Sequence, residues 1–214
     1  MRKQQDKWHW YDGKLYSYLI DPCTEDVRKI ISDLIEYNSN VIDIGCGTGS
    51  LAFYLSNKCE YVLGIELSKR MIDYANSIKI QNSVFNVDFL YGDAIKMSSL
   101  TEKNFDYAIF SLSLHEIESN SRVKSLEEAK KITNKIIIYD YLAEEKTSIR
   151  GLINSIIEFI AGKEHYINYK SFVREKGIFG LLEKNGFNVE KFIIDKKIYG
   201  VVKANVNRLK SNDI

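Results

Sequence analysis

The chain has 214 residues, 45% of them hydrophobic and 28% charged, a mixture that excludes a disordered chain and suffices for a buried core. Lysine and arginine total 30 against 29 acidic residues, so a net charge of +1 gives no overall electrostatic argument for nucleic-acid binding. No apolar run reaches the roughly 20 residues that a membrane-spanning helix needs, and the polar, aromatic start is not typical of a secretory signal. The 3 cysteines lack metal-ligand spacing, which favours free thiols in a reducing cytoplasm. We therefore expect a cytoplasmic globular protein.

The first two thirds of the chain alternate between helical and strand patterns. Apolar residues recur at helical spacing between Val27 and Ile35, and Thr24 is placed to cap that helix. Further helices are expected from about Ser50, from a cap at Ser68, and around 121–131. Apolar runs predict strands at 41–44, 61–66, 85–91, 105–112 and 135–141. This alternation predicts an α/β fold, a mostly parallel sheet with helices on both faces.

The last part of the chain departs from this alternation. Helices are expected at 147–161 and 172–184, followed by strands at 187–195 and 198–204. A tight turn at Lys196 and Lys197 joins the two strands. Because a parallel crossover needs a dozen or more residues, these strands must form an antiparallel hairpin.

The strongest motif is VIDIGCGTGS at 41–50, a strand that ends in alternate glycines and leads into a helix. Such glycines let the backbone turn sharply and approach a ligand closely. A dinucleotide-binding loop would need glycine where this chain has Ser50, and a phosphate-binding P-loop would need a lysine that is absent. Asp43 would repel a pyrophosphate and attract a cation. The loop therefore favours a cationic nucleoside.

Two further acids follow neighbouring strands. Glu66 comes 17 residues after Gly49, close to the spacing of about 20 residues at which an acid reaches a ribose diol in such folds. Asp93 follows the next strand and could accept a hydrogen bond from an exocyclic amine, although a Gly-Asp pair is also ordinary turn chemistry. Together with Asp43, these acids would line one cleft at the carboxyl edge of the sheet.

Four segments, VIDIGCGTGS, GIELSKRMI, LYGDA and FDYAIFSLSLHEI, resemble in order the motifs of the class I S-adenosylmethionine-dependent methyltransferases. The resemblance spans about 24–204 and is greatest to the small-molecule enzymes of ubiquinone and menaquinone biosynthesis. It implies a Rossmann-like, seven-stranded sheet with an antiparallel C-terminal hairpin. It also implies S-adenosyl-L-methionine as cofactor and S-adenosyl-L-homocysteine as product.

The resemblance assigns roles to individual residues. Asp43 would orient the methionine amino group, Glu66 would bind the ribose hydroxyls, and Asp93 would read the adenine edge. The other cofactor-binding positions that it implies are Tyr11, Gly45, Cys46, Gly47, Gly49, Leu67, Ala94, Phe110 and Ser111. For Cys46, filling a small buried space is the competing interpretation.

His115 is the candidate catalytic base, since a side chain that titrates near neutral pH suits proton removal. The competing interpretation is a histidine that packs beside the next helix. Aromatic and histidine side chains suggest an acceptor pocket formed by Trp10, Tyr16, His115, Tyr141, His165, Tyr166 and Tyr169. We expect one domain, with an N-terminal lid at 1–23, a cofactor-binding core at 24–146, an inserted helical cap at 147–171, and a final helix and hairpin at 172–204.

The predicted activity is in-line methyl transfer to a small-molecule acceptor, with no metal site and no membrane span. The first alternative is an RNA-modifying methyltransferase, which the neutral charge disfavours. The Asn/Asp-Pro-Pro-Tyr/Phe motif of amino-methylating nucleic-acid enzymes is also missing, since residues 111–114 read SLSL. A second alternative is a binding module without chemistry. An arsenite acceptor is a minor third, because the cysteines lack the expected arrangement.

Overall fold

A computed structural model describes residues 12–142, 162–196 and 198–206. The α-helices are α1 (Lys14–Leu19), α2 (Glu25–Asp33), α3 (Ser50–Leu55), α4 (Lys69–Gln81), α5 (Ser119–Ile132), α7 (Lys163–Arg174) and α8 (Gly177–Asn185). The strands are β1 (Asn40–Ile44), β2 (Tyr61–Glu66), β3 (Val87–Tyr91), β4 (Phe105–Ser111), β5 (Thr133–Tyr141), β6 (Asn188–Asp195) and β7 (Tyr199–Asn205). Short 3-10 helices are η1 (Asp21–Thr24), η2 (Ala94–Ser99) and η3 (Leu114–Glu116).

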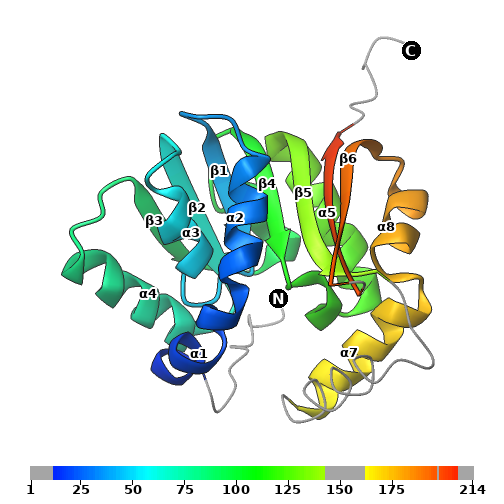
Figure 1. Cartoon of the computed structure of the whole chain (residues 1–214), viewed down its shortest axis with the longest axis horizontal. Coiled ribbons are helices and arrows are strands. Elements are labelled where there is room, and N and C mark those ends of the chain that lie inside the picture. The colour runs from blue at the N-terminus through cyan, green and yellow to red at the C-terminus, as the bar shows by residue number, and fades with distance from the viewer. Residues whose placement is uncertain (1–11, 143–161, 197, 207–214) are drawn as a thin grey trace.

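The strands form one 7-stranded sheet in the order β3-β2-β1-β4-β5-β7-β6 (Figure 1). Neighbours from β3 to β5 are parallel, whereas β7 pairs antiparallel with both β5 and β6. The predicted α/β class and the antiparallel C-terminal hairpin are therefore confirmed. The strand order reverses between β1 and β4, and open α/β sheets bind their ligands at such a switch point.

Helices cover both faces of the sheet (Figure 1). Alternate β1 residues take opposite sides, as the two-residue period of a strand requires. Ile42 and Ile44 pack in a core cluster with residues of α5, α7 and α8, whereas Val41 packs with residues of α2, α3 and α4. The central strands β2, β1, β4 and β5 are buried between two helical layers, so a site can form at the ends of these strands.

The helix expected at 172–184 is wrong in its boundaries, because two helices meet inside it. α7 ends at Arg174 and α8 begins at Gly177, after Lys176 in the left-handed region at φ 69°. Gly177 also has a positive φ of 55°, and a Cβ there would lie 2.1 Å from the carbonyl oxygen of Leu142. Close backbone approach therefore forces the break. The helix expected at 147–161 lies outside the described residues.

Two predicted helix caps have different outcomes. Ser68 accepts from the backbone N–H of Met71 at 3.4 Å, so the predicted cap of α4 is confirmed. Thr24 occupies the capping position of α2, but its hydroxyl donates to the carbonyl of Asp21 at 2.8 Å and makes no capping bond. The hydroxyl bonds within η1 because the carbonyl of Asp21 lies three residues before Thr24, which is one turn of a 3-10 helix.

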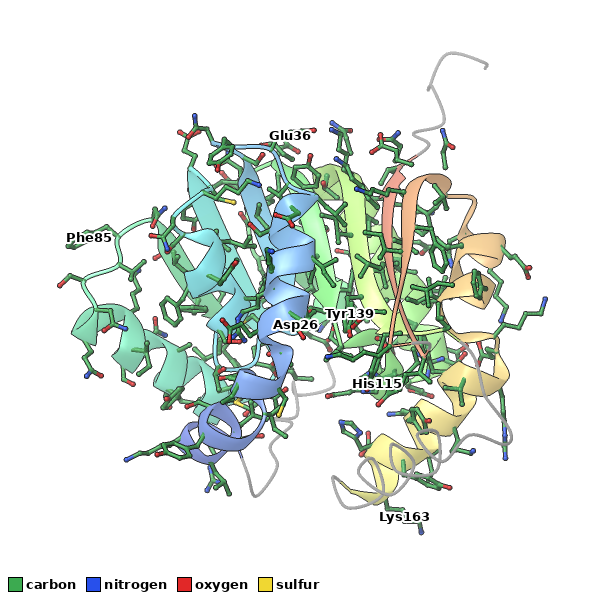
Figure 2. The ribbon with its side chains drawn as sticks, in the orientation of Figure 1. Asp26, Glu36, Phe85, His115, Tyr139 and Lys163 are labelled. Carbon is green, nitrogen blue, oxygen red and sulfur yellow. The ribbon has the colours of Figure 1, made fainter. Side chains whose placement is uncertain are left out.

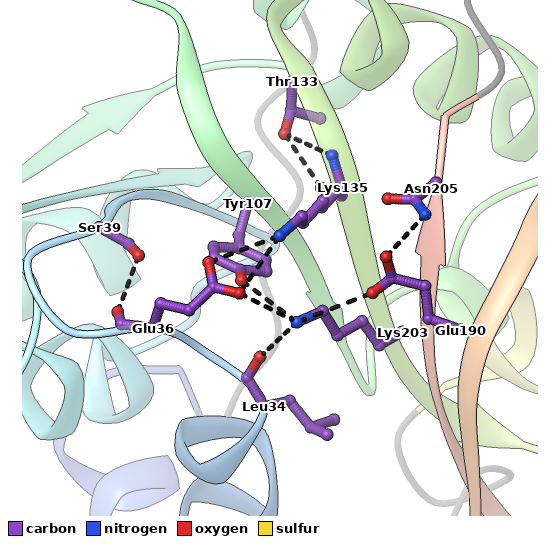
Figure 3. A network of polar contacts seen from close by, with 9 residues as sticks. All are labelled: Leu34, Glu36, Ser39, Tyr107, Thr133, Lys135, Glu190, Lys203 and Asn205. Carbon is purple, nitrogen blue, oxygen red and sulfur yellow. Dashed lines mark hydrogen bonds and ion pairs between the residues drawn. The ribbon is translucent and has the colours of Figure 1, made fainter.

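Figure 3 shows a polar network around Glu36 and Lys203. It lies at the end of the sheet opposite to the strand ends that form the site (Figure 2). Lys135 and Lys203 lie 3.2 Å and 3.6 Å from the Glu36 carboxylate, and Lys203 also donates to the hydroxyl of Tyr107 at 3.2 Å. The network joins the segment after α2 to strands β4, β5 and β7. Since these groups satisfy one another and lie far from the strand ends of the site, we assign the network a structural role.

No helix among the described ranges is long and apolar enough to cross a membrane. All three cysteines are free thiols, with Cys23 exposed and both Cys46 and Cys59 buried. The expected reducing compartment stays a prediction.

Candidate active site

The carboxyl ends of β1 to β4 surround a cavity of about 290 Å³. Its wall includes Ile44 at the end of β1, Glu66 at the end of β2, Asp93 after β3, and Ser111 at the end of β4. η3, the start of α5, and α7 complete the opposite side through residues such as Glu116. The volume is near the lower limit of ordinary small-molecule pockets.

Gly47, in the loop after β1, lines this cavity. Its φ is 54°, a left-handed conformation that glycine adopts without strain, and a Cβ built on it meets no atom within 4 Å. The residue therefore presents bare backbone to open space. Its N–H donates to Oε2 of Glu66 at 3.2 Å, which links the glycine loop to the end of β2.

Asp43 is the most unusual acid of the site. Its side chain is 1% exposed, and its Oδ2 has no hydrogen-bond partner among the described residues. Burial, and then the charge of Glu66, raise the pKa of Asp43 to about 7. Asp43 lines a second cavity of about 50 Å³, which shares Tyr16 and Gly45 with the main cavity. A buried carboxylate in this state is suited to a cationic partner.

The other two acids are partly engaged by backbone. Glu66 accepts from the N–H of Ser68 at 2.8 Å as well as from Gly47, and burial raises its pKa despite these bonds. Oδ1 of Asp93 accepts from the N–H of Ile95 at 3.1 Å and caps η2, so the turn interpretation is confirmed. Each carboxylate still lines the cavity and has lone pairs left for a ligand.

The predicted cofactor-binding residues fall into three groups. The main cavity is lined by Gly45, Gly47, Glu66, Leu67, Asp93, Ala94 and Ser111. Asp43 and Cys46 line the small cavity, and burial raises the pKa of the Cys46 thiol. Gly49 begins α3 against Phe89, Phe110 is fully buried in the core, and Tyr11 lies outside the described residues.

His115 lies at the carboxyl edge of the sheet next to α7, and its side chain does not line the cavity (Figure 2). It is 3% exposed, and its Nδ1 lies 2.8 Å from Oδ1 of Asp140, which is fully buried. Oδ2 of Asp140 accepts from the N–H groups of Leu114 and His115 at 3.0 Å and 3.2 Å. Asp140 thus fixes both η3 and the imidazole, whose catalytic role stays a prediction.

The predicted acceptor-binding residues lie mostly behind the cavity wall. The rings of Tyr141 and Tyr169 pack 4.9 Å and 6.4 Å from that of His115, measured between centroids. His165 bonds Glu116 at 2.9 Å, while Tyr166 packs against the core. Among the described predicted acceptor residues, only Tyr16 lines the cavity. Trp10 lies outside the described residues.

Several cavity residues were not predicted from the sequence. They are acidic or polar side chains contributed mainly by the turn after β4 and by α7: Asp12, Glu116, Glu118, Glu164 and Asn168. Asp140 and Asp21 were also missed; Asp21 accepts from the Thr48 hydroxyl at 2.6 Å and so holds the glycine loop. A usable signal existed for Asp140, an acid inside the apolar run IIIYDY. Asp12 carried none.

The fold of this chain is shared with methyltransferases of known structure. Over 90% of its length, the chain is similar to a SAM-dependent methyltransferase from Aquifex aeolicus (TM-score 0.62, 21% identity, 93% of that chain). It is also similar to a magnesium protoporphyrin IX methyltransferase from Synechocystis PCC 6803 with bound S-adenosylhomocysteine (SAH). The TM-score is 0.61 at 18% identity, over 86% of this chain and 82% of that one. Both have the class I S-adenosylmethionine-dependent methyltransferase fold.

A family model described as a methyltransferase domain matches residues 35–169, more than half of the chain. The chain therefore belongs to this methyltransferase family. An uncharacterised methyltransferase of Schizosaccharomyces pombe is 23% identical over 87% of this chain and 72% of its own length. The resemblance of the motifs to class I methyltransferases is confirmed.

Other relatives match a shorter part. An uncharacterised RNA methyltransferase of Mycoplasma mobile is 34% identical over 37% of this chain, and one of Clostridium acetobutylicum is 32% identical over 35%. This chain spans only 22% and 17% of the length of those two proteins.

Proposed function

We propose that this protein transfers the methyl group of S-adenosyl-L-methionine to a small-molecule acceptor in the cavity at the carboxyl edge of the sheet. One observation carries the proposal. Asp43, Glu66 and Asp93 lie near the carboxyl ends of three neighbouring strands around the glycine loop, and the buried Asp43 has one oxygen that no described residue bonds. A positively charged adenosyl compound satisfies all three acids at once.

The chemistry of the lining residues suits this cofactor. The bare backbone of Gly47 leaves room beside Glu66, whose carboxylate can accept from ribose hydroxyls. Asp43 would take the ammonium group, and Asp93 with the N–H of Ala94 would meet the adenine edge. The cofactor supplies an activated methyl group on a sulfonium, so the chain contributes mainly by alignment. Such positioning can supply about 7–11 kcal/mol.

The charge of the cavity favours a small acceptor over RNA. Six carboxylates line its described wall: Asp12, Glu66, Asp93, Glu116, Glu118 and Glu164. The same described wall contains no lysine, arginine or histidine. RNA-binding surfaces need basic side chains to neutralise phosphates, and this entrance would repel them. A neutral or cationic small molecule has no such penalty.

The shape of the cavity favours an enzyme over a module that only binds the cofactor. A binding module needs the strand ends and the glycine loop alone. Here the cavity extends from the strand ends to Glu116, Ile117 and Asn168 on the opposite side. This additional space gives an acceptor a place beside the methyl group.

The test is methyl transfer from methyl-labelled cofactor, with a cell extract separated into small metabolites and total RNA. We expect label in the metabolite fraction and none in RNA, with less than a twofold change in rate between 50 and 300 mM salt. Labelled RNA, with activity that falls steeply as salt rises, would support the RNA-modifying alternative instead. Tight SAH binding without any labelled product would support the binding module.

A further inference from the structure

Two buried histidines and one glutamate meet beside the cavity, outside the predicted cofactor contacts. His115 and His165 are 3% and 5% exposed, and their ring centroids lie 5.7 Å apart. Glu116 lines the cavity, and its Oε1 lies 2.9 Å from Nε2 of His165. One potential ligand atom from each of the three residues lies within 4.8 Å of the other two.

The three ligand atoms come from two separate elements. His115 and Glu116 are consecutive residues of η3, and His165 lies in the first turn of α7. Arg122 fixes the two elements relative to one another, since its guanidinium donates to the carbonyls of Leu114 at 2.9 Å and Asn168 at 2.8 Å. The side chain of Asn168 adds a bond to the carbonyl of Glu116 at 2.8 Å. The cluster is thus held from both sides.

The contact between His115 and Asp140 supports a metal-binding function. A histidine that ligates a metal usually directs its other ring N–H to a carboxylate, which fixes the tautomer and the ring orientation. Nδ1 of His115 does so toward Asp140 at 2.8 Å, and Asp140 is itself held by three backbone N–H groups, those of Leu114, His115 and Tyr141. In this arrangement a metal ion would take Nε2 of His115, the other nitrogen of the ring.

We propose that His115, His165 and Glu116 bind one divalent transition-metal ion at the edge of the cavity. Two imidazoles and one carboxylate are typical ligands of Zn²⁺, Fe²⁺ and Co²⁺, whereas Mg²⁺ and Ca²⁺ prefer oxygen ligands alone. Ligand atoms around an ion with bonds of about 2.0–2.2 Å lie roughly 3–4 Å apart, so small side-chain movements complete the site. Water or acceptor takes the remaining positions.

The role of this ion rests on the proposed function, although its binding does not. Glu116 lines the cavity, so the ion would face the acceptor. A metal ion lowers the pKa of a bound hydroxyl, thiol or water. An acceptor with an oxygen or sulfur nucleophile could therefore attack the methyl carbon as its anion, with its proton released to solvent.

The test uses Co²⁺ as a spectroscopic probe on chelator-treated full-length protein. We expect one Co²⁺ per chain, visible d–d bands of a nitrogen and oxygen site, and no thiolate charge-transfer band. Zn²⁺ should displace Co²⁺ and abolish the bands. All measurements use a Cys23→Ser background, because Cys23 is the one exposed free thiol in the described chain.

Variants locate the site. His165→Ala and Glu116→Gln should each weaken Co²⁺ binding at least about tenfold, and Asp140→Asn by about 10–100-fold because it orients a ligand. Glu118→Gln is the matched control, since Glu118 lines the same cavity but lies outside the cluster. It should bind Co²⁺ as the parent does. SAH binding, measured for every variant, reports an intact fold.

Two results would overturn the proposal. One is the absence of Co²⁺ and Zn²⁺ binding by a parent protein that still binds SAH, which would leave the proposed function intact. The other is unchanged Co²⁺ binding by both His165→Ala and Glu116→Gln. If His165→Ala fails to fold, Glu116→Gln decides alone, because the Glu116 side chain is 33% exposed and tolerates replacement. Loss of SAH binding by the parent would contradict the proposed function instead.

Discussion

The backbone N–H of Gly47 donates to Oε2 of Glu66 across 3.2 Å, which joins the glycine loop after β1 to the last residue of β2. The second oxygen of Glu66 accepts from Ser68, which in turn caps α4. Loop, strand end and helix start therefore form one connected unit. A ligand that binds Glu66 meets a preorganised carboxylate, which reduces the ordering that binding must supply.

Asp43 should make the stability of the protein depend on pH. The native state holds its proton more tightly than the unfolded state, because its pKa is raised from 3.8 to about 7. Its contribution to the free energy of unfolding is most favourable below about pH 4 and is lost as pH rises through 7. Relative to the parent, Asp43→Asn should therefore be about 2–3 kcal/mol more favourable at pH 8 than at pH 5.

Urea unfolding at both pH values measures this difference. Asp73→Asn is the matched control, since the Asp73 side chain is 63% exposed and pairs with Lys69 on the same helix face. An equal stability change for Asp43→Asn at pH 5 and pH 8 would contradict the prediction.

Ligand binding should also release a proton from Asp43. At pH 6 a carboxyl group with a pKa of about 7 is largely protonated, and a bound ammonium group favours the carboxylate. We expect release of up to about one proton per SAH bound at pH 6, and little at pH 8.5. Titration calorimetry in buffers of different ionisation enthalpy measures it. Asp43→Asn should release none; the same release from variant and parent would place the proton elsewhere.

A methyl group on Gly47 should interfere with the cofactor. Gly47 and Gly186 both have positive φ, 54° and 62°, and a Cβ on either meets nothing within 4 Å. Alanine at either position should therefore destabilise the fold by a similar amount, about 1 kcal/mol. Gly47→Ala alone projects into the cavity, so it should weaken SAH binding about tenfold or more while Gly186→Ala leaves it unchanged. Equal SAH affinities of Gly47→Ala and Gly186→Ala would show that Gly47 does not contact the cofactor.

Arg122 should be a major determinant of stability around the site. The side chain is 1% exposed and donates to the carbonyls of Leu114 and Asn168. Arg122→Leu removes a buried donor from both carbonyls, although that of Leu114 keeps the N–H of Ile117 at 3.2 Å, and we expect a loss of about 1–3 kcal/mol in urea unfolding. Lys124→Ala on the exposed face of α5 should change stability by less than about 0.5 kcal/mol. If Arg122→Leu leaves the free energy of unfolding unchanged, the cost of burying the guanidinium charge equals the stabilisation from its hydrogen bonds.

Local patterns were sufficient to predict most of the fold. The alternation of strand and helix patterns predicted the sheet, and the close spacing of the last two strands predicted its antiparallel end. The break at Lys176 and Gly177 was not predictable, because its cause is the nearby backbone of Leu142, a contact between distant segments. The hydroxyl of Thr24 was likewise diverted by the turn that precedes it.

The two halves of the site differ in the same way. The strand ends were predictable because each acid follows an apolar run at a fixed place in a parallel sheet. The opposite wall, with Glu116 and Asn168, depends on how α7 packs on η3, and no local pattern encodes that packing. Asp140 was visible as an acid in an apolar run, but its partner could be found only in three dimensions.

The most direct test of the central claim is calorimetric titration of the full chain with SAH, followed by NAD and ATP at equal concentrations. The three acids and the glycine loop predict one SAH site per chain, which Asp43→Asn weakens by about 1.5–3 kcal/mol, and no heat from NAD or ATP. Binding of NAD or ATP by a folded protein that ignores SAH would contradict the account.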